Sequence, residues 1–299
     1  MGSCFAENIG EIVQQYKFNV SINPHGVLYN PASIALALRR YVNNKPIQEN
    51  DLFFANECWN SWEHHSRFSN SDKQNCITEI NKNVSSAHDF LKQAEWLFIT
   101  FGSAFVYKLT ETNQLVGNCH KIPQKEFTKS LLTVVEIIED YQTLISGLKK
   151  INNKLKIVFT VSPVRYVRDG VVENNLSKAR LIEAVHDIEK QNDNVHYFPA
   201  YELVIDDLRD YRFYKTDLVH PNNQAIEYVF EKLKDVVFDE ETKILFEKIK
   251  DIISAKVHRP FNARTESYRK FKTLFLQRCT QLQKQYPFLN LSDEVKFFS

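Results

Sequence analysis

The stretch WLFITF, Trp96–Phe101, decides the fold class of this chain. It is a short continuous apolar run, which is typical of a strand buried on both faces of a parallel sheet. Lys154–Ser162 is a second run of the same kind, and Val195–Pro199 is a shorter one. Helical patterns over Phe127–Ile151 and Ser177–Gln191 separate these strands. Strands that alternate with helices in this way predict an α/β fold with right-handed crossovers.

The elements before this stretch continue the alternation. We expect a helix over Ile9–Tyr16, a short strand over Phe18–Ile22 and an amphipathic helix over Pro31–Val42. The predicted architecture is a three-layer sandwich around a mainly parallel, flavodoxin-like sheet. In such folds ligands bind in the crevice at the carboxyl ends of the strands.

A C-terminal helical appendage follows the α/β domain. We place the α/β domain at residues 1–237 and the appendage at 238–299, with helices over Glu240–Lys256 and Ala263–Tyr286. Each helix carries an apolar stripe at helical spacing. The stripes either pack within the chain or form a homodimer surface, so the sequence is compatible with a monomer or a homodimer.

Composition excludes several classes of protein. The chain has 299 residues, 43% of them hydrophobic, and a net charge of +1, which gives no electrostatic footprint for nucleic acid. Its apolar runs are far shorter than the roughly 20 residues of a membrane span. The five cysteines include no C-x-x-C pair, and no secretory signal is apparent. We therefore expect a cytoplasmic protein without a disulfide framework.

An acid and a base stand three residues apart at Asp217 and His220. In a Ser-His-Asp type of site, a carboxylate orients the imidazole that takes the proton of the nucleophile. Asn222 is a good N-cap residue for the helix that follows, so the pair lies on a loop attached to a helix. Alternatively, Asp217 is only a local cap and His220 an exposed side chain.

A nucleophile is available at the other end of the chain. Gly2-Ser3-Cys4 precedes a helix, and a small glycine suits the tight turn from which a nucleophile is presented. Amides at a helix N-terminus lower a thiol pKa and stabilise an oxyanion. The alternative is an unstructured terminus.

The run Gly2–Ala6 reads GSCFA, and on this motif the chain resembles the GSCFA family, a bacterial group placed among the SGNH/GDSL-type hydrolases. Further segments carry the resemblance along most of the chain: Asn23–Gly26, Tyr29–Pro31, Thr100–Ser103, Asn118–Lys121, Ser162–Arg165, Leu208–Tyr214 and Asp217–Pro221.

The resemblance implies catalytic roles at both ends of the chain. The first block of the superfamily, Gly-Asp-Ser, places Cys4 at the nucleophile position, and a one-residue shift gives that role to Ser3. Asp217 and His220 match the last block. In the superfamily the nucleophile follows a central strand, whereas only Met1 precedes Gly2 here. Either the sheet lacks this strand or the chain starts further upstream, and we expect about 20 to 40 further residues there, enough for a strand and its lead-in.

The resemblance also implies oxyanion and substrate-binding residues. Gly26 resembles the glycine whose amide donates to the oxyanion. Gly102 matches the glycine of the third block, but Ala104 stands where an asparagine is expected. Asn118 is a substitute from the next loop, and His120 of the same loop is a candidate substrate-binding residue.

Two further features bear on substrate binding. Asn50–Asn75 is a polar, aromatic insertion, predicted to be a lid that presents Trp62 or His65 to substrate, or else plain surface. Adjacent histidines are awkward ligands for one ion, so no metal is expected. Arg212, just before the acid-base turn, is a candidate clamp for a carboxylate or phosphate.

These features together predict an SGNH-like hydrolase that cleaves an ester in a small acylated carbohydrate or metabolite. Its mechanism needs neither a metal nor an organic cofactor. An acyltransferase, or a non-catalytic binding module on the same fold, stays open because fold alone does not decide function.

Overall fold

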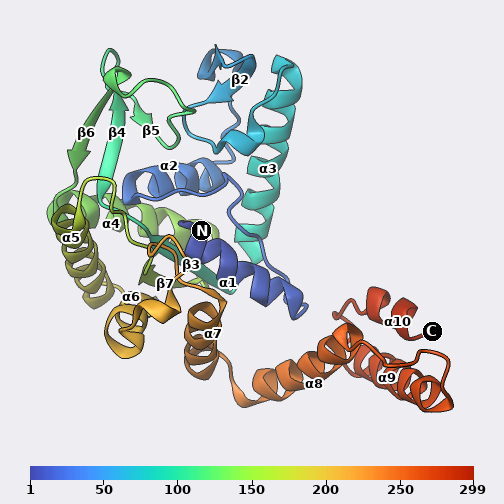
Figure 1. Ribbon diagram of the computed structural model, residues 1–299. Coiled ribbons are helices and arrows are strands. Elements are labelled where there is room, and N and C mark those ends of the chain that lie inside the picture. Colours follow the sequence, from blue (N-terminus) through green and yellow to red (C-terminus); the bar gives the residue numbers. More distant parts are fainter. The chain divides into compact units, whose positions relative to one another are not determined.

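The computed structural model describes all residues from Met1 to Ser299, and the chain forms two compact units (Figure 1). The N-terminal unit contains Met1–Ile9 and Ser21–Val229, and the C-terminal unit contains Gly10–Val20 and Phe230–Ser299. Helices α1 (Cys4–Gln15) and α7 (Asn223–Val237) contribute residues to both units. α1 confirms the helix expected after the N-terminal motif.

A parallel sheet forms the centre of the N-terminal unit. Its strands are β3 (Trp96–Phe101), β7 (Lys156–Val161) and β8 (Val195–Tyr197), in the order β3-β7-β8. All three were expected from the sequence, and β3 has the predicted bounds. Helices α4 (Val134–Ile151) and α5 (Val171–Lys190) lie between these strands in the chain, so the α/β class is confirmed.

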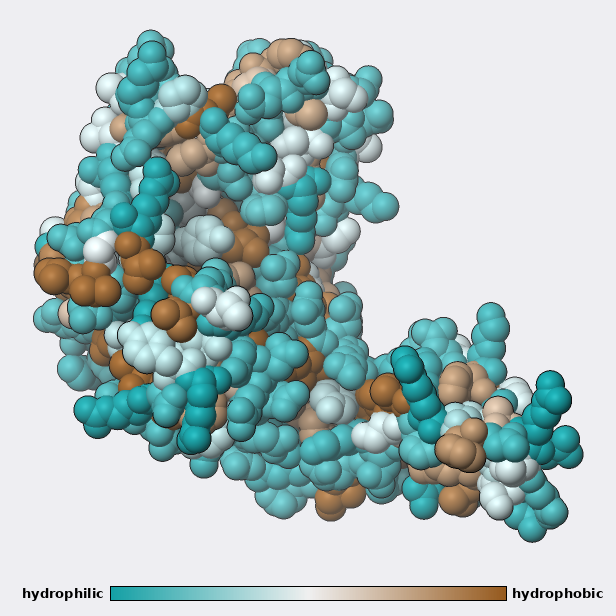
Figure 2. Space-filling model, viewed as in Figure 1, coloured by the Kyte–Doolittle hydropathy of each residue, from teal (hydrophilic) through white to brown (hydrophobic).

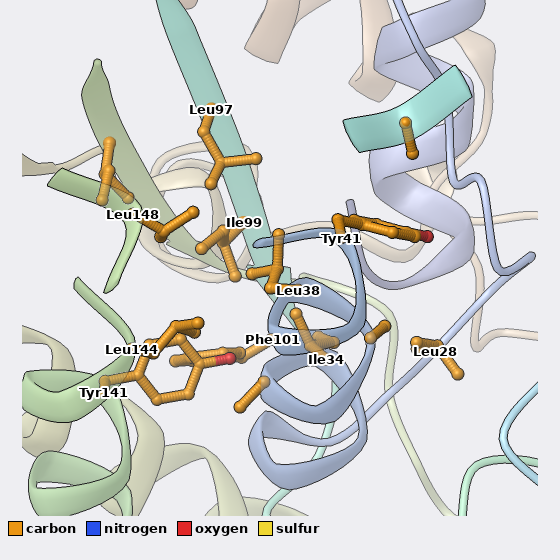
Figure 3. Packing of buried hydrophobic residues seen from close by; sticks show 14 of the residues in the cluster. Leu28, Ile34, Leu38, Tyr41, Leu97, Ile99, Phe101, Tyr141, Leu144 and Leu148 are labelled. Carbon is orange, nitrogen blue, oxygen red and sulfur yellow. The ribbon is translucent and has the colours of Figure 1, made fainter. Parts of the chain in front are cut away.

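Helices pack against one face of this sheet. Ile99 and Phe101 of β3 contact apolar residues of α2 (Pro31–Val42) and α4, among them Leu38 and Tyr141 (Figure 3). These side chains are at most 1% exposed. Burying each large apolar side chain contributes roughly 1.5–3 kcal/mol. Helix α3 (Lys73–Gln93) adds its apolar stripe to the same cluster.

The other two sheets are antiparallel and were not expected from the sequence. β1 (Leu52–Ala55) pairs with β2 (Cys58–Ser61) inside the insertion. β4 (Phe105–Leu109) lies between β5 (Leu115–Val116) and β6 (Phe127–Leu131). The sequence placed β6 in a helix, but burial alternates along it, and the capping box of Thr133 and Glu136 begins α4 only at Val134.

The strand expected over Phe18–Ile22 is absent. Phe18 packs instead against Phe238, with 5.1 Å between the ring centroids, inside the C-terminal unit. Because its ring finds an aromatic partner there, this segment has no role in the sheet. The prediction failed because Phe18 packs against a residue far along the chain, between α7 and the next helix.

The C-terminal unit is helical. It contains α8 (Glu240–Val257), α9 (Glu266–Gln285) and α10 (Ser292–Phe298). The stripes of α8 and α9 meet in one cluster that includes Ile249, Cys279 and Phe298, so both stripes have a partner within the chain. None of the helices is long and apolar enough to span a membrane.

The remaining short helices are a helical turn α6 (Ala200–Glu202), a π-helical turn at Leu203–Leu208, and 3-10 turns at Glu49–Asp51, Ser66–Phe68, Gln124–Glu126 and Tyr211–Phe213. α6 and the π turn lead from β8 into the segment that carries the acid-base pair. π turns occur frequently at functional sites.

Candidate active site

The first residues of the chain lie beside the end of β3. Gly2 forms a parallel bridge with Thr100, and the Ser3 amide donates to the Thr100 carbonyl at 3.2 Å. Gly2 has φ +132°, and a Cβ there would lie 2.1 Å from that carbonyl oxygen. Only glycine fits this approach, which lets the chain pass directly from the sheet edge into α1.

The two candidate nucleophiles differ in access. Ser3 is 1% exposed, and its hydroxyl is buried without a hydrogen-bond partner. Cys4, the first residue of α1, is half-buried. Because a nucleophile must reach its substrate, the geometry favours Cys4 over Ser3.

The Cys4 thiol is not activated by the helix start alone. Burial raises its pKa above the ordinary value, and this effect outweighs the amides of Cys4 and Phe5 and the charge of Lys215, which lower it. Glu7 also raises it. The expected low thiol pKa is therefore not present in this state, and the thiol needs a base to become a nucleophile.

Asp217 both builds the acid-base turn and orients His220. One carboxylate oxygen accepts from the amides of Val219 and His220 at 2.9 and 3.0 Å, and the other lies 2.8 Å from His220 Nδ1. These amides are the largest cause of the lowered Asp217 pKa, about 2. Since an ionised carboxylate only accepts, Nδ1 carries the proton and Nε2 is left as the base.

The acid-base turn is the tip of a tight loop. The Lys215 amide donates to the His220 carbonyl at 2.7 Å, and Leu218 at the tip has φ +57°. Asn222 accepts from the Ala225 amide at 3.1 Å where α7 begins, which confirms it as the cap. The loop is therefore attached to a helix, as the sequence predicted.

Arg165 connects this loop to the end of β7. Its amide donates to the Val219 carbonyl at 3.2 Å. Its guanidinium lies over the rings of Tyr211 and Tyr214, 5.0 and 4.5 Å from their centroids, and donates to the Tyr211 hydroxyl at 3.1 Å. The acid-base turn is thus held near the carboxyl end of β7.

Both halves of the candidate site lie at the carboxyl ends of the parallel strands. The Ser3 amide donates to Thr100 at the end of β3, and Arg165 follows the end of β7. Lys215, in the acid-base loop, is close enough to Cys4 for its positive charge to lower the thiol pKa. No hydrogen bond joins His220 to Cys4 or Ser3, and His220 Nε2 has no partner. Direct contact between base and nucleophile stays a prediction.

The amides of the two predicted oxyanion glycines have other partners. Gly26 donates to the Asn23 carbonyl and Gly102 to the Tyr29 carbonyl, each at 2.7 Å. Gly26 has φ +82°, and a Cβ there would lie 2.1 Å from His65 Cβ. Its evident role is conformational. No backbone carbonyl accepts from the amides of Cys4 and Phe5, which lie at the Cys4 thiol and lower its pKa.

The remaining predicted residues do not contact the acid-base pair. Asn118 accepts from the His120 amide at 2.9 Å, and the buried His120 ring bonds the Ser61 carbonyl at 2.8 Å. Both therefore belong to the surroundings of the insertion. Arg212 is exposed and lies over the Phe213 ring, 4.9 Å from its centroid. The roles proposed for these three in substrate binding stay predictions.

The insertion packs onto the Asn23–Gly26 turn. The His65 amide donates to the His25 carbonyl at 2.9 Å, and the buried rings of His25 and His64 stack with 3.9 Å between centroids. Burial lowers the His64 pKa to about 3. Trp62 stacks on Phe53 rather than facing the acid-base turn. No group of three or more metal-binding side chains is arranged around one point.

Lys178 of α5 is a residue that the sequence analysis missed. Its side chain is 1% exposed, and Nζ donates to the carbonyls of Gly102 and Ser162, both at 2.6 Å. Burial lowers its pKa to about 7. One signal was present: Lys178 occupies a position in the helical stripe of Leu181 and Val185, where an apolar residue is expected.

Comparison with known proteins assigns the chain to a family. A family model described as "GSCFA family" matches residues 1–233. The chain belongs to the GSCFA family. Residues 249–299 match a second model, "GSCFA domain protein, C-terminal domain", which falls within the C-terminal unit of this GSCFA protein. No curated protein and no solved structure matches the chain.

Proposed function

We propose that this GSCFA protein is an SGNH-like hydrolase that cleaves an ester bond through Cys4. The observation that carries the proposal is the Asp217–His220 pair, in which Asp217 orients the His220 ring and His220 Nε2 has no partner. This pair lies at the same end of the parallel sheet as the half-buried Cys4 thiol. The three-layer sandwich of that superfamily belongs to the proposal. The β3-β7-β8 order supports it, with the Gly2 bridge on the free side of β3.

The chemistry follows from the protonation states. Nε2 of His220 takes the thiol proton as Cys4 sulfur attacks the ester carbonyl, and Asp217 stabilises the imidazolium. The amides of Cys4 and Phe5 hold the oxyanion. The imidazolium then returns the proton to the departing alcohol, which leaves a thioester. Water, deprotonated by His220, releases the acid and restores the thiol.

Apolar surface beside the site supports an acyl substrate. Val171, Val172 and Leu176 of α5 are each about half exposed or more, and brown side chains gather over α5 in Figure 2. The loop from the end of β7 leads into this helix. An acyl chain would bury part of this surface, so we propose a small acylated metabolite or carbohydrate as substrate.

A non-catalytic binding module is the second candidate. The raised Cys4 pKa and the occupied amides of Gly26 and Gly102 favour it, because a resting hydrolase usually has its oxyanion donors available. An acyltransferase would use the same residues, with an alcohol in place of water.

A panel of p-nitrophenyl esters tests the proposal. We expect the wild type to release p-nitrophenol, and Cys4→Ala and His220→Ala to lose this activity. Ser3→Ala is expected to keep it, because the Ser3 hydroxyl is buried. Adding acceptor alcohols distinguishes transfer from hydrolysis by the product. If Cys4→Ala is as active as wild type while Ser3→Ala is inactive, Cys4 is not the nucleophile.

A further inference from the structure

Arg165 is a partly buried cation beside the acid-base turn, and no carboxylate lies within 4.0 Å of its guanidinium. Its side chain donates instead to a neutral group, the Tyr211 hydroxyl, at 3.1 Å. By contrast, Arg40 donates twice to the Glu63 carboxylate, at 2.7 and 2.8 Å. Because a guanidinium has five N–H donors, Arg165 retains free donors and a positive charge that no contacting carboxylate balances.

The acidic residues of the neighbouring loop are bonded elsewhere. Asp210 accepts from the Arg212 amide at 2.8 Å. Asp217 uses one carboxylate oxygen for the two turn amides and the other for His220 Nδ1. The loop therefore supplies no counter-charge for Arg165, which leaves dissolved ions or a bound ligand to provide it.

Arg165 contacts the loop on both sides of His220. Its amide donates to the carbonyl of Val219, the residue before His220, at 3.2 Å. Its guanidinium lies over the Tyr214 ring, 4.5 Å from the centroid, and Tyr214 forms an antiparallel bridge with Pro221, the residue after His220. The guanidinium is thus held against the same loop that presents the base.

Two aromatic rings fix the position of the guanidinium. The rings of Tyr211 and Tyr214 are 5.9 Å apart and tilted by 46°, and the guanidinium carbon lies 5.0 and 4.5 Å from their centroids. Tyr214 is buried, so its ring is held by packing. A guanidinium that is already positioned loses less conformational entropy when it binds a ligand, and its planar N–H groups match the two oxygens of a carboxylate.

We propose that Arg165 is a specificity-determining residue that binds a carboxylate on the alcohol portion of the ester. This rests on the proposed function, in which the His220 imidazolium returns its proton to the departing alcohol. The alcohol oxygen must then lie within reach of His220, so the groups that flank the His220 loop contact this portion of the substrate. The acyl chain takes the apolar surface of α5. The substrate class is an O-acyl hydroxy acid.

Three esters built on one ring test this proposal: p-acetoxybenzoate, its neutral isostere p-acetoxybenzamide, and p-acetoxyphenyl phosphate. We expect the wild type to have its highest kcat/KM with the benzoate. Arg165→Gln should raise KM for the benzoate about 10- to 100-fold, the range of a charge-assisted hydrogen bond, with a much smaller effect on kcat and on the benzamide. A higher wild-type kcat/KM with the phosphate would overturn the choice of a carboxylate.

Two further variants separate binding from structure. Arg165→Lys keeps the charge without the planar N–H groups and should retain part of the preference for the benzoate. Arg168→Gln removes an exposed arginine of the same loop, which donates to Gln124 at 3.2 Å, and should leave all three profiles unchanged. The bond from the Arg165 amide to Val219 persists in every variant. An equal loss on benzoate and benzamide in Arg165→Gln would show that Arg165 only braces the loop, and the proposal would be overturned.

Binding of the product phenols is independent of hydrolase activity. Isothermal titration calorimetry compares p-hydroxybenzoate with p-hydroxybenzamide on wild type and Arg165→Gln. Tighter binding of p-hydroxybenzoate that is lost in Arg165→Gln, in a protein that cleaves no ester, would support the carboxylate site and count against the proposed function. Equal binding of the two phenols by wild type would overturn the carboxylate site, even if esters are cleaved.

Discussion

Two histidine-containing regions of the N-terminal unit differ in what surrounds the rings. His220 lies on an exposed loop, with a carboxylate on Nδ1 and an unpaired Nε2. His25 and His64 are each 1% exposed and stack on one another, without a carboxylate. The same side chain is therefore prepared for proton transfer in one place and forced to stay neutral in the other. The hydrogen-bond partners and the burial of each imidazole ring decide between these two behaviours.

The largest expected effect comes from His220. His220→Ala should lower kcat/KM by about 10⁴-fold, as loss of a base of this kind does, because no other group replaces Nε2. Thermal unfolding should change little, since the ring is exposed. Ester hydrolysis and calorimetry measure the two effects, with His186→Ala, another half-exposed histidine, as a matched control. Full activity in His220→Ala would mean that Asp217 and His220 have only a structural role in the turn before α7.

Asp217→Asn should cost about 10³-fold in kcat/KM. The amide can keep an acceptor for the turn amides, but it no longer fixes the proton on Nδ1 or stabilises the imidazolium. A fall in kcat with little change in the unfolding temperature would fit this role. Loss of folding in the same variant would instead mean that Asp217 is chiefly a structural cap.

The buried histidines should make the protein sensitive to acid. His64 has a pKa of about 3 in the folded state and about 6.5 when unfolded. Between these values the unfolded chain binds more protons, so stability is complete above about pH 6.5 and falls as the pH falls towards 3. Urea unfolding at several pH values measures this slope, which we expect to be shallower in His64→Phe. An identical slope would assign the acid sensitivity to other groups.

Gly26→Ala separates the conformational role of Gly26 from a catalytic one. With φ at +82° and His65 Cβ 2.1 Å from the added carbon, we expect a loss of about 2 kcal/mol in stability. Gly147→Ala in α4 is the matched control, because its nearest neighbour lies at 3.7 Å, and it should be neutral or stabilising. A stable Gly26→Ala with lower kcat would restore the oxyanion role.

Elements with a strong local pattern were predictable. The strand Trp96–Phe101 and the helix Pro31–Val42 have their predicted bounds, since continuous apolar runs and capped amphipathic repeats need no distant information. The Asn222 cap was readable for the same reason. Phe18–Ile22 and Phe127–Leu131 were wrong because long-range partners, Phe238 and strand β4, decide their structure.

The amino-acid sequence by itself determined the α/β class and the resemblance to the GSCFA family, and it identified Asp217 and His220 as a pair, because their spacing is local. Only the tertiary structure decided that Ser3 is buried while Cys4 is accessible, and that the Gly26 and Gly102 amides already have partners. It also placed the buried Lys178 ammonium against the carbonyls of Gly102 and Ser162, which follow β3 and β7. Burial, hydrogen-bond partners and pKa depend on segments that meet only when the chain folds, so no local pattern could reveal them.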